Sequence, residues 1–536
     1  MSMPNLQPKK QTTDIVVIGC GSGGGVIAKE LSEAGLSVVV LESGKRFNPL
    51  LHYKTYEQNF EVTASEIFQP DNPQRDLYTC EGKWFGYNRV KGVGGSTLRY
   101  IGVVPRFHES DFRVRSEDGV SDDWPISYAE LEPYYTKVEY ELGVSGLDDT
   151  LANPFDPPRS KPYPTPPHEF NCASKAVKRG ADKLGLHLTP APLASPTRPW
   201  NGRPSCIECG GCMFGCFVTA KSSIDVTYVR KAEATGLVDI RTQSMAREIT
   251  VRPDGKAHSV IYFDAGGNEQ EICASAIVVA GNAVETPRLL LLSKSGLFPE
   301  GLANSSGLVG KYFTEHLALF CDGLFSERLD TWRGNPAGGI IQDFYETNKR
   351  NNFVRGWTIE VNNGGKWPLS VASKVNGWGK EHKVRMKEVF GYLVGLASIG
   401  EQLPDIRNQV TLDHDVKDHV GIPVPKLTNE PRENDRKMMK AILRSFKAVF
   451  EASGAREMWE PKMGASAHYL GTCRMGKNPD TSVVDPWCRT HDVPNLFIAD
   501  SSVFVTGAAV NPALTIMALA TRTAKGIIAG FKQGVL

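Results

Sequence analysis

The chain has 536 residues, more than one ordinary domain holds, which predicts at least two hydrophobic cores. Its 61 basic and 60 acidic residues leave a formal net charge of +1 without a basic run or acidic tail, so nucleic acid is not an expected partner. No apolar stretch is long and uninterrupted enough to predict a transmembrane segment. The N-terminal residues lack the apolar core of a secretory signal, so the cytoplasm is the default expectation.

The first predicted element is a buried parallel strand that enters a glycine-rich turn. The apolar, β-branched run 14–18 is followed by Gly19, Gly21 and Gly24 in the pattern G-x-G-x-x-G. A helix and a second strand follow, and that strand ends at Glu42. Such glycines let a pyrophosphate approach the backbone at a helix N-terminus, and the acidic residue stands where ribose hydroxyls bind. The pattern predicts a dinucleotide site but does not separate NAD from FAD.

A second glycine-rich loop, with Gly94, Gly95 and Ser96, lies far along the chain from the first. Pro-rich sequence from 154 to 167 then predicts an extended excursion over the surface. Beyond it, the apolar run 277–281 predicts another buried strand that enters a glycine turn and a helix.

Four of the 11 cysteines lie close together with the spacing C-x2-C-x2-C-x3-C: Cys206, Cys209, Cys212 and Cys216. Thiolates at such spacing can hold an iron–sulfur cluster, whereas zinc sites more usually separate two C-x-x-C pairs. The bacterial ferredoxin run has this spacing but is followed by proline, and its fourth cysteine ligates a different cluster; here Phe217 follows. An iron–sulfur cluster is the favoured interpretation, and structural zinc and unligated thiols remain as alternatives.

Three motifs near the C-terminus carry polar residues beside apolar sequence. His468 begins an H-x-x-G-T motif, Asp500 ends a short apolar run, and Asn511 precedes Pro512. Oxidation of an alcohol requires a base for the hydroxyl proton, and a neutral histidine suits that role. The Asn511 amide can bind the same oxygen, although a helix cap is an alternative role.

These motifs, in this order from about residue 12 to the end, resemble the glucose–methanol–choline (GMC) oxidoreductases, FAD enzymes that oxidise alcohols. The resemblance is weakest between about 330 and 400. Within the family the chain is most similar to the catalytic subunit of bacterial FAD-dependent glucose dehydrogenase. That closer similarity rests on the cysteine run and on segments 123–128, 131–135 and 304–307.

The resemblance implies FAD and gives roles to the motif residues. His468 matches the catalytic base, and Asn511 matches a second active-site position that holds histidine or asparagine. Asp500 matches a residue beside the ribityl and pyrophosphate portion of the cofactor. No histidine lies between Tyr53 and Arg106, where some relatives attach FAD covalently, so FAD is expected to bind non-covalently.

The resemblance also implies a ligand set for the cysteine run. The glucose dehydrogenase relative carries a three-iron (3Fe-4S) cluster on cysteines that match Cys206, Cys212 and Cys216. Cys209 is additional to that pattern. It is either a fourth ligand, which would make the cluster 4Fe-4S, or an unligated neighbour.

The predicted fold is α/β: a doubly wound, Rossmann-like FAD domain with a second α+β substrate domain built on a mainly antiparallel sheet. Segments 12–110, 218–315 and 460–536 are assigned to the FAD domain, and 111–217 to an excursion that carries the cysteines. Segment 316–459 is assigned to the substrate domain, with strands near 353–361 and 389–399 and a helix over 437–452.

The predicted function is a dehydrogenase that oxidises an alcohol group of a sugar, polyol or related alcohol. FAD accepts the hydride, and electrons leave through the cluster to a haem protein, quinone or small carrier. The alternative is an oxidase that uses dioxygen, with structural cysteines. The resemblance allows a small partner subunit, and a partner with an export signal would carry the protein to the periplasm.

Overall fold

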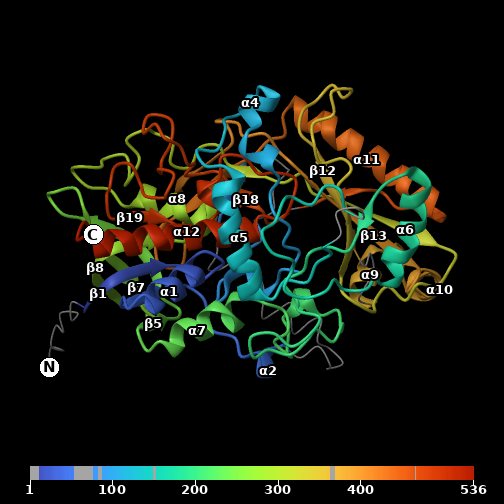
Figure 1. Ribbon diagram of the computed structural model, residues 1–536, viewed down its shortest axis with the longest axis horizontal. Helices are drawn as coiled ribbons and strands as arrows, with labels where there is room; N and C mark the ends of the chain where they lie inside the picture. The colour runs from blue at the N-terminus through green and yellow to red at the C-terminus, as the bar shows by residue number, and fades with distance from the viewer. Residues whose placement is uncertain (1–10, 54–76, 82–86, 149–152, 363–367, 465) are drawn as a thin grey trace.

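The computed structural model describes residues 11–53, 77–81, 87–148, 153–362, 368–464 and 466–536. Two large sheets with their covering helices form the framework of the molecule and lie side by side (Figure 1). The chain passes from one sheet to the other several times, so each sheet contains strands from distant parts of the sequence.

The first sheet is mainly parallel. Its strands lie in the order β5, β2, β1, β8, β7, β6, and β19 also pairs with β8. Their bounds are β1 Gln11–Ile18, β2 Val38–Leu41, β5 Val238–Arg241, β6 Met245–Val251, β7 Ala257–Phe263, β8 Glu269–Val279 and β19 Leu496–Ile498. β1 pairs in parallel with β2 and β8, whereas β6 and β7 extend the sheet in antiparallel pairing. Ile15, Val16 and Val17 are fully buried, as expected for a parallel strand covered on both faces.

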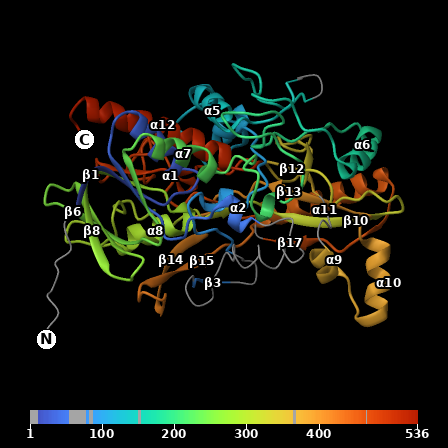
Figure 2. The same cartoon turned by 90° about the horizontal axis from the view of Figure 1, so that it is seen from below.

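Helices cover both faces of this sheet (Figure 2). α1 (Gly24–Glu33), α7 (Tyr228–Ala234) and α12 (Ala513–Lys532) lie on one face, and α8 (Asn282–Leu292) lies on the other. By length and composition α12 could cross a membrane, but 67% of its apolar window is buried inside the fold, where it packs on α1 and α5 (Tyr128–Leu142). Such burial is typical of a core helix.

The second sheet is antiparallel, with its strands in the order β16, β10, β13, β12, β11, β4, and β17 paired with β10. Their bounds are β4 Leu188–Thr189, β10 Leu319–Phe325, β11 Ala337–Ile341, β12 Trp357–Asn362, β13 Leu393–Gly400, β16 Ala455–Met458 and β17 Lys462–Met463.

One face of this second sheet is covered by α6 (Cys172–Leu184) and α11 (Glu433–Ser453), which pack against each other. Ile359 and Val361 of β12 belong to the apolar core under these helices. Because side chains alternate along a strand, Glu360 points to the opposite face of the sheet.

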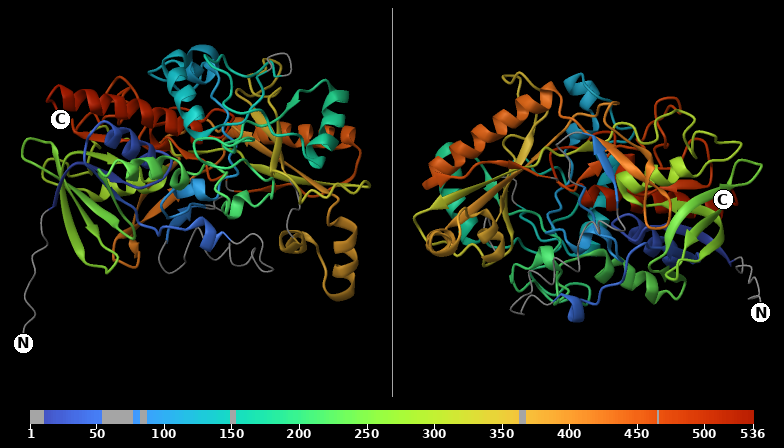
Figure 3. Two further views of the ribbon diagram at one scale, coloured as in Figure 1. Left: turned by 60° about the horizontal axis from the view of Figure 1, so that its bottom comes forward. Right: turned by 180° about the vertical axis from the view of Figure 1, so that it is seen from behind.

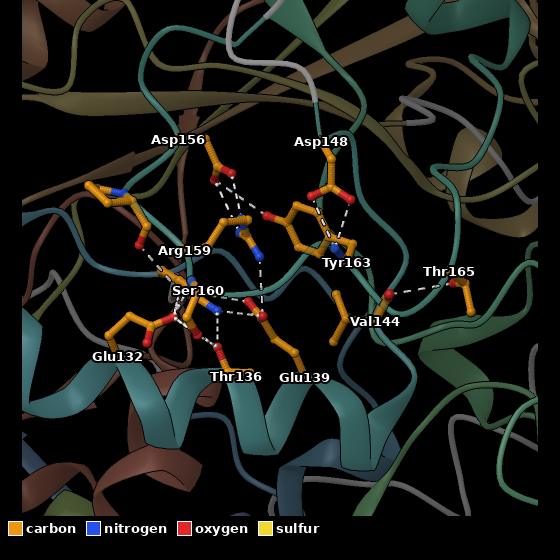
Figure 4. A network of polar contacts seen from close by, with 12 residues as sticks. Glu132, Thr136, Glu139, Val144, Asp148, Asp156, Arg159, Ser160, Tyr163 and Thr165 are labelled. Carbon is orange, nitrogen blue, oxygen red and sulfur yellow. Dashed lines mark hydrogen bonds and ion pairs between the residues drawn. The ribbon is translucent and has the colours of Figure 1, made fainter.

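The Pro-rich segment is held against α5 by a polar network (Figure 4). On α5, the Glu132 carboxylate accepts a hydrogen bond from the Ser160 N–H at 2.9 Å. About two helical turns farther along α5, Glu139 pairs with Arg159, with 3.2 Å between Oε2 and Nη1. Ionic contacts therefore fix this segment on its way to the cysteine run.

The remaining elements are short. A three-stranded sheet contains β3 (Thr79–Glu81), β14 (Gln409–Lys417) and β15 (Pro423–Thr428), and β9 (Thr314–Glu315) pairs with β18 (Tyr469–Leu470). The other helices are α2 Pro49–His52, α4 Val114–Asp118, α9 Pro368–Lys374 and α10 Gly379–Val389. Single 3-10 turns are η1 Gly95–Leu98, η2 Glu109–Phe112, η3 Cys212–Phe214, η4 Ile224–Val226 and η5 Ser501–Val503. α10 projects from one end of the molecule (Figure 3).

The predicted fold class is confirmed, with one doubly wound sheet and one antiparallel sheet. The strands expected near 353–361 and 389–399 are β12 and β13, and the helix expected over 437–452 is α11. The domain limits stay predictions. Segment 111–217 adds to the second sheet in two ways: β4 pairs with β11 and extends the sheet, and α6 packs on its face.

Candidate active site and cysteine cavity

The first glycine-rich turn is packed so closely that two of the three glycines of its G-x-G-x-x-G pattern have no room for a side chain. A Cβ atom on Gly19 would lie 2.4 Å from the Ala280 carbonyl oxygen, and one on Gly24 would lie 1.9 Å from the Gly19 carbonyl oxygen. Gly19 also has a φ of +97°, which favours glycine. These two glycines allow β1, β8 and α1 to meet.

Gly21, in contrast, has open space beside it. The nearest protein atom to a Cβ there would be the Gly95 Cα at 3.9 Å. Gly21, Gly95 and Ser96 line one cavity, and the Gly94 N–H joins the two loops by donating to the Cys20 carbonyl at 2.9 Å. The space lies at the N-terminus of α1, so a pyrophosphate has room to reach the backbone N–H groups.

The cavity contains about 1360 Å³ of empty space, part of it open to solvent. This space extends from the two glycine-rich loops to His468, so it suits an elongated ligand such as a dinucleotide. Its lining includes Gly19, Glu42, Asp500 and His468, as well as Pro512, the residue after Asn511. Seven of the ten residues predicted for catalysis or cofactor binding therefore line one space: Gly19, Gly21, Glu42, Gly95, Ser96, His468 and Asp500.

Glu42 is buried at the end of β2 and holds the first glycine turn. Its Oε2 accepts a hydrogen bond from the Cys20 N–H at 2.9 Å, and its Oε1 accepts one from the Gly44 N–H at 2.8 Å. Burial raises the pKa of this carboxyl group. One oxygen still keeps a lone pair that a ribose hydroxyl can use. The contact with ribose itself stays a prediction.

Asp500 ties the end of β19 to the start of α8. Its Oδ2 accepts hydrogen bonds from the Asn282 N–H at 2.9 Å and the Thr286 hydroxyl at 2.5 Å, and its Oδ1 accepts one from the Ser502 N–H at 2.8 Å. Burial raises the pKa of the Asp500 carboxyl group. Its role beside the cofactor stays a prediction, and its structural role is to join two elements that line the cavity.

His468 lines the cavity and contacts a second histidine, His316. Their Nδ1 atoms lie 2.9 Å apart, and the rings are nearly perpendicular at 86°. His316 Nε2 lies 3.1 Å from the Gly507 carbonyl oxygen and 2.9 Å from that of Ala508. Burial lowers the pKa of His316 to about 4, and burial together with the neighbouring ring lowers the pKa of His468 well below its usual value. Both rings are therefore neutral at physiological pH, and a neutral His468 can accept a proton.

The rest of the H-x-x-G-T motif positions the backbone that carries His468. Gly471 has a φ of +86°, and a Cβ atom there would lie 2.7 Å from the Tyr312 carbonyl oxygen. Thr472 donates its hydroxyl to the Ala283 carbonyl at 2.7 Å. The glycine thus allows a close backbone crossing, and the threonine anchors the segment to α8.

Glu315, the neighbour of His316, holds the residues before His468. Its Oε1 accepts hydrogen bonds from the Ser466 N–H at 2.6 Å and the Ser466 hydroxyl at 3.0 Å, and the Ser466 oxygen accepts one from the His468 N–H at 3.1 Å. Burial raises the pKa of Glu315 to about 8. Two consecutive residues therefore hold both the backbone and the ring of the predicted base.

Asn511 lies just before α12, and its side chain hydrogen-bonds to Glu360 of β12. Glu360 is 4% exposed, and its Oε1 has no hydrogen-bond partner within the part of the chain that the structure describes. Burial raises the pKa of this carboxyl group to about 7. The second sheet therefore supplies a polar group next to one of the two predicted active-site residues.

The four clustered cysteines line a second, smaller cavity. Cys212 is buried, Cys206 and Cys216 are half-buried, and Cys209 is exposed. Among these four residues, all of which the structure describes, no three bring their sulfur atoms within 4.8 Å of one another. A tetrahedral zinc ion with Zn–S distances of about 2.3 Å needs sulfurs about 3.8 Å apart. No three of the sulfur atoms therefore lie as close together as the ligands of one tetrahedral zinc ion.

Two of the sulfur atoms accept backbone hydrogen bonds. The Glu208 N–H donates to Cys206 Sγ at 3.3 Å, and the Lys221 N–H donates to Cys216 Sγ at 3.4 Å. Hydrogen bonds of this kind to cluster sulfurs help to set the reduction potential of a cluster. Burial raises the pKa of the Cys206 thiol, a cost that is removed when a metal takes the thiolate. Thiolates are ligands for zinc as well as for iron–sulfur clusters.

Lys221 also joins the cysteine loop to the second glycine-rich loop. Its Nζ donates to the carbonyl oxygens of Leu98 at 2.9 Å, Tyr100 at 3.1 Å and Cys212 at 2.7 Å. The side chain is buried, which lowers its pKa. Because the same glycine-rich loop lines the larger cavity, one short segment lies between the two cavities.

Residues 16–318 and 404–520 match the GMC oxidoreductase family. The chain belongs to this family. It is 36% identical to the 2-methyl-1,2-propanediol dehydrogenase of Mycolicibacterium austroafricanum, over 95% of this chain and 94% of the relative. It is 30% identical to the fructose dehydrogenase large subunit of Gluconobacter japonicus, over 98% and 99%. Among solved structures, pyridoxine 4-oxidase from Mesorbium loti has the same fold, with a TM-score of 0.66, 18% identity and coverage of 96% and 99%.

Membership of the GMC family makes the protein an FAD-dependent oxidoreductase that acts on alcohol groups. The residues present fit the cofactor, because the cavity joins both glycine-rich loops and leaves open space beside Gly21. Gly19, Gly21, Gly95 and Ser96 line the space that FAD requires, whereas Gly24 and Gly94 support it from behind.

Sequence reasoning missed four residues of these sites: Glu315, His316, Glu360 and Lys221. None belongs to a motif with a known spacing, and each acts through a partner more than a hundred residues away or through a loop carbonyl. The sequence offered only weak indications of these residues. His316 stands beside Glu315, and Lys221 lies five residues after Cys216.

Proposed function

We propose that this GMC oxidoreductase is a dehydrogenase for a sugar, a polyol or a related alcohol. His468 accepts the hydroxyl proton of the substrate at its cavity-facing ring nitrogen, and Asn511 orients the oxygen. When bound, FAD supplies the acceptor for the hydride of the same carbinol carbon. The observation that carries this proposal is the position of His468 on the wall of the dinucleotide cavity, where burial lowers the pKa of its ring.

We further propose that electrons leave through an iron–sulfur cluster held by the cysteine loop. Cys206, Cys212 and Cys216 are the proposed ligands, and Cys209 is the proposed fourth ligand or an unligated neighbour. Support comes from the shared cavity, from the N–H···S bonds and from Lys221, which connects this loop to the wall of the FAD cavity. Such a cluster, when bound, carries electrons one at a time.

The proposed substrate class follows the relatives. One relative is named as a dehydrogenase of a diol and another as a dehydrogenase of fructose. The latter is named as a large subunit, which supports a small partner subunit here as well. The proposed electron acceptor is a haem protein, a quinone or a small carrier. The cytoplasm stays the proposed location unless such a partner carries an export signal.

A screen of alcohols against anaerobic bleaching of the flavin absorbance tests the first step. Sugars, polyols and short diols should bleach the flavin without any added acceptor. If no alcohol bleaches the flavin, the proposed activity fails.

Iron and acid-labile sulfide measured on anaerobically purified protein test the exit route. Electron paramagnetic resonance distinguishes an oxidised three-iron cluster from a reduced four-iron cluster. Protein that lacks iron but is reoxidised rapidly by dioxygen would instead be an oxidase with structural cysteines.

A further inference from the structure

The hydrogen bonds of His316 determine where its ring carries hydrogen. Its Nε2 lies within hydrogen-bond distance of two carbonyl oxygens, those of Gly507 and Ala508. A carbonyl oxygen only accepts hydrogen bonds, so the Nε2 atom must be the donor. In a neutral imidazole the other nitrogen, Nδ1, then has a lone pair and no hydrogen.

That lone pair faces His468. The two Nδ1 atoms are 2.9 Å apart, so one of them must donate to the other. Since the Nδ1 of His316 is the acceptor, the Nδ1 of His468 carries the hydrogen. The Nε2 of His468 is consequently the unprotonated nitrogen of a ring that lines the cavity.

The assignment depends on a neutral His316, because a cationic ring would donate from Nδ1 and reverse it. His316 is 2% exposed, and its ring contacts carbonyl oxygens and another imidazole. The adjacent carboxyl group, Glu315, binds Ser466, and its raised pKa of about 8 leaves it uncharged at neutral pH. Burial without a charged partner therefore favours the neutral ring.

We infer that His316 is a positioning residue that fixes the ring hydrogen of His468 on Nδ1 and so presents Nε2 to the substrate hydroxyl. The inference rests on the proposed function, in which His468 is the base. Without the acceptor at His316, both tautomers of the His468 ring and more than one orientation of that ring would be populated. In serine proteases, loss of the group that sets the histidine tautomer lowers kcat about 10⁴-fold.

Three variants of His316 separate this role from a purely structural one. Asn in place of His316 keeps an acceptor near the Nδ1 position. Gln keeps a donor near the Nε2 position but removes that acceptor, and Leu removes both groups. His414→Gln, at an exposed histidine of β14, is the matched control. Flavin content and thermal unfolding temperature verify that each variant is folded.

The first measurement is anaerobic stopped-flow reduction of the flavin by an alcohol that bleaches the wild type. His316→Gln and His316→Leu should lower the limiting rate at least about tenfold with an unchanged substrate Kd, whereas His316→Asn should keep most of the rate. A wild-type rate in His316→Gln would overturn the inference. An equal loss in all three variants would also overturn it, because the retained acceptor would then have no effect.

The second measurement does not depend on activity. Nitrogen-15 spectra of the flavin-loaded enzyme with labelled histidine report which ring nitrogen carries hydrogen, and the His468→Ala spectrum identifies the His468 signals. The wild type should show hydrogen on Nδ1, and His316→Gln should show a mixture. Hydrogen on Nε2 of wild-type His468 would overturn the inference, whether or not an alcohol reduces the flavin. Failure of every alcohol to reduce the flavin would reject the proposed function but would leave this inference about the ring hydrogen standing.

Discussion

The histidine pair and the cysteine loop are two polar sites on either side of one glycine-rich loop, and they are stabilised differently. His316 and His468 flank or follow paired strands, and their ring nitrogens, except the one toward the cavity, are bonded to protein groups. The cysteine loop has only a single 3-10 turn, with Glu208 and Gly210 in left-handed conformations. The difference teaches that protein groups alone complete the proposed site for proton transfer, whereas the proposed iron–sulfur site would be completed only by its metal.

The largest expected effect is the loss of flavin reduction when the histidine site is removed. His468→Ala should lower the rate of anaerobic flavin reduction at least about 100-fold, because general base catalysis contributes about 10²–10⁴-fold. The flavin absorbance and the unfolding temperature should stay close to those of the wild type. The exposed His414→Ala variant is the control. Flavin reduction at the wild-type rate in His468→Ala would exclude this residue as the base.

The next largest effect is expected from substitutions of the clustered cysteines, which leave the histidine site unchanged. Serine in place of Cys206, Cys212 or Cys216 should abolish most of the bound iron and the transfer of electrons to an external one-electron acceptor. Flavin reduction by the alcohol should be unchanged, because the proton site does not use these thiols. Cys172→Ser, an exposed cysteine at the start of α6, is the control.

Cys209→Ser decides the number of ligands. A variant that keeps its iron and its resonance signal indicates three ligands, whereas loss of iron or a changed signal indicates four. Wild-type electron transfer in all four serine variants would reject the proposed exit route.

A smaller effect tests the connection between the two regions. Lys221→Met leaves three buried carbonyl oxygens without their donor, and one unsatisfied buried group costs about 1–3 kcal/mol. We expect a loss of about 3 kcal/mol in the free energy of unfolding, measured by denaturant titration, and weaker retention of iron. Lys175→Met, at an exposed lysine of α6, should change neither quantity. Unchanged stability in Lys221→Met would show that the lysine does not hold the loop.

The smallest effect concerns pH and the carboxyl group beside Asn511. The pKa of Glu360 is raised to about 7 in the folded protein, so folding favours its protonated form. This contribution to stability is complete below the unfolded pKa, near 4.5, and is lost as the pH rises through 7. Glu360→Gln should therefore become more stable relative to the wild type between pH 5 and pH 8. A stability difference that does not change with pH would contradict the raised pKa.

Much of both sites could be predicted from short stretches of sequence. The glycine turn, His468 with its H-x-x-G-T motif and the cysteine run each place their chemistry within about a dozen residues, where spacing alone carries the information. Glu42 and Asp500 follow apolar strands, so their places at the edge of the first sheet could also be predicted.

The contacts that complete the sites were decided only by the tertiary structure. His316 and His468 are separated by 152 residues and meet because β9 pairs with β18. The second sheet has one face covered by helices and one face directed toward the first domain. Glu360 contacts Asn511 because its side chain lies on that second face of β12. The sequence by itself determined which groups are the candidates for the chemistry, because their spacing is local. Their protonation states and partners depend on burial and on long-range strand pairing, which local spacing does not encode.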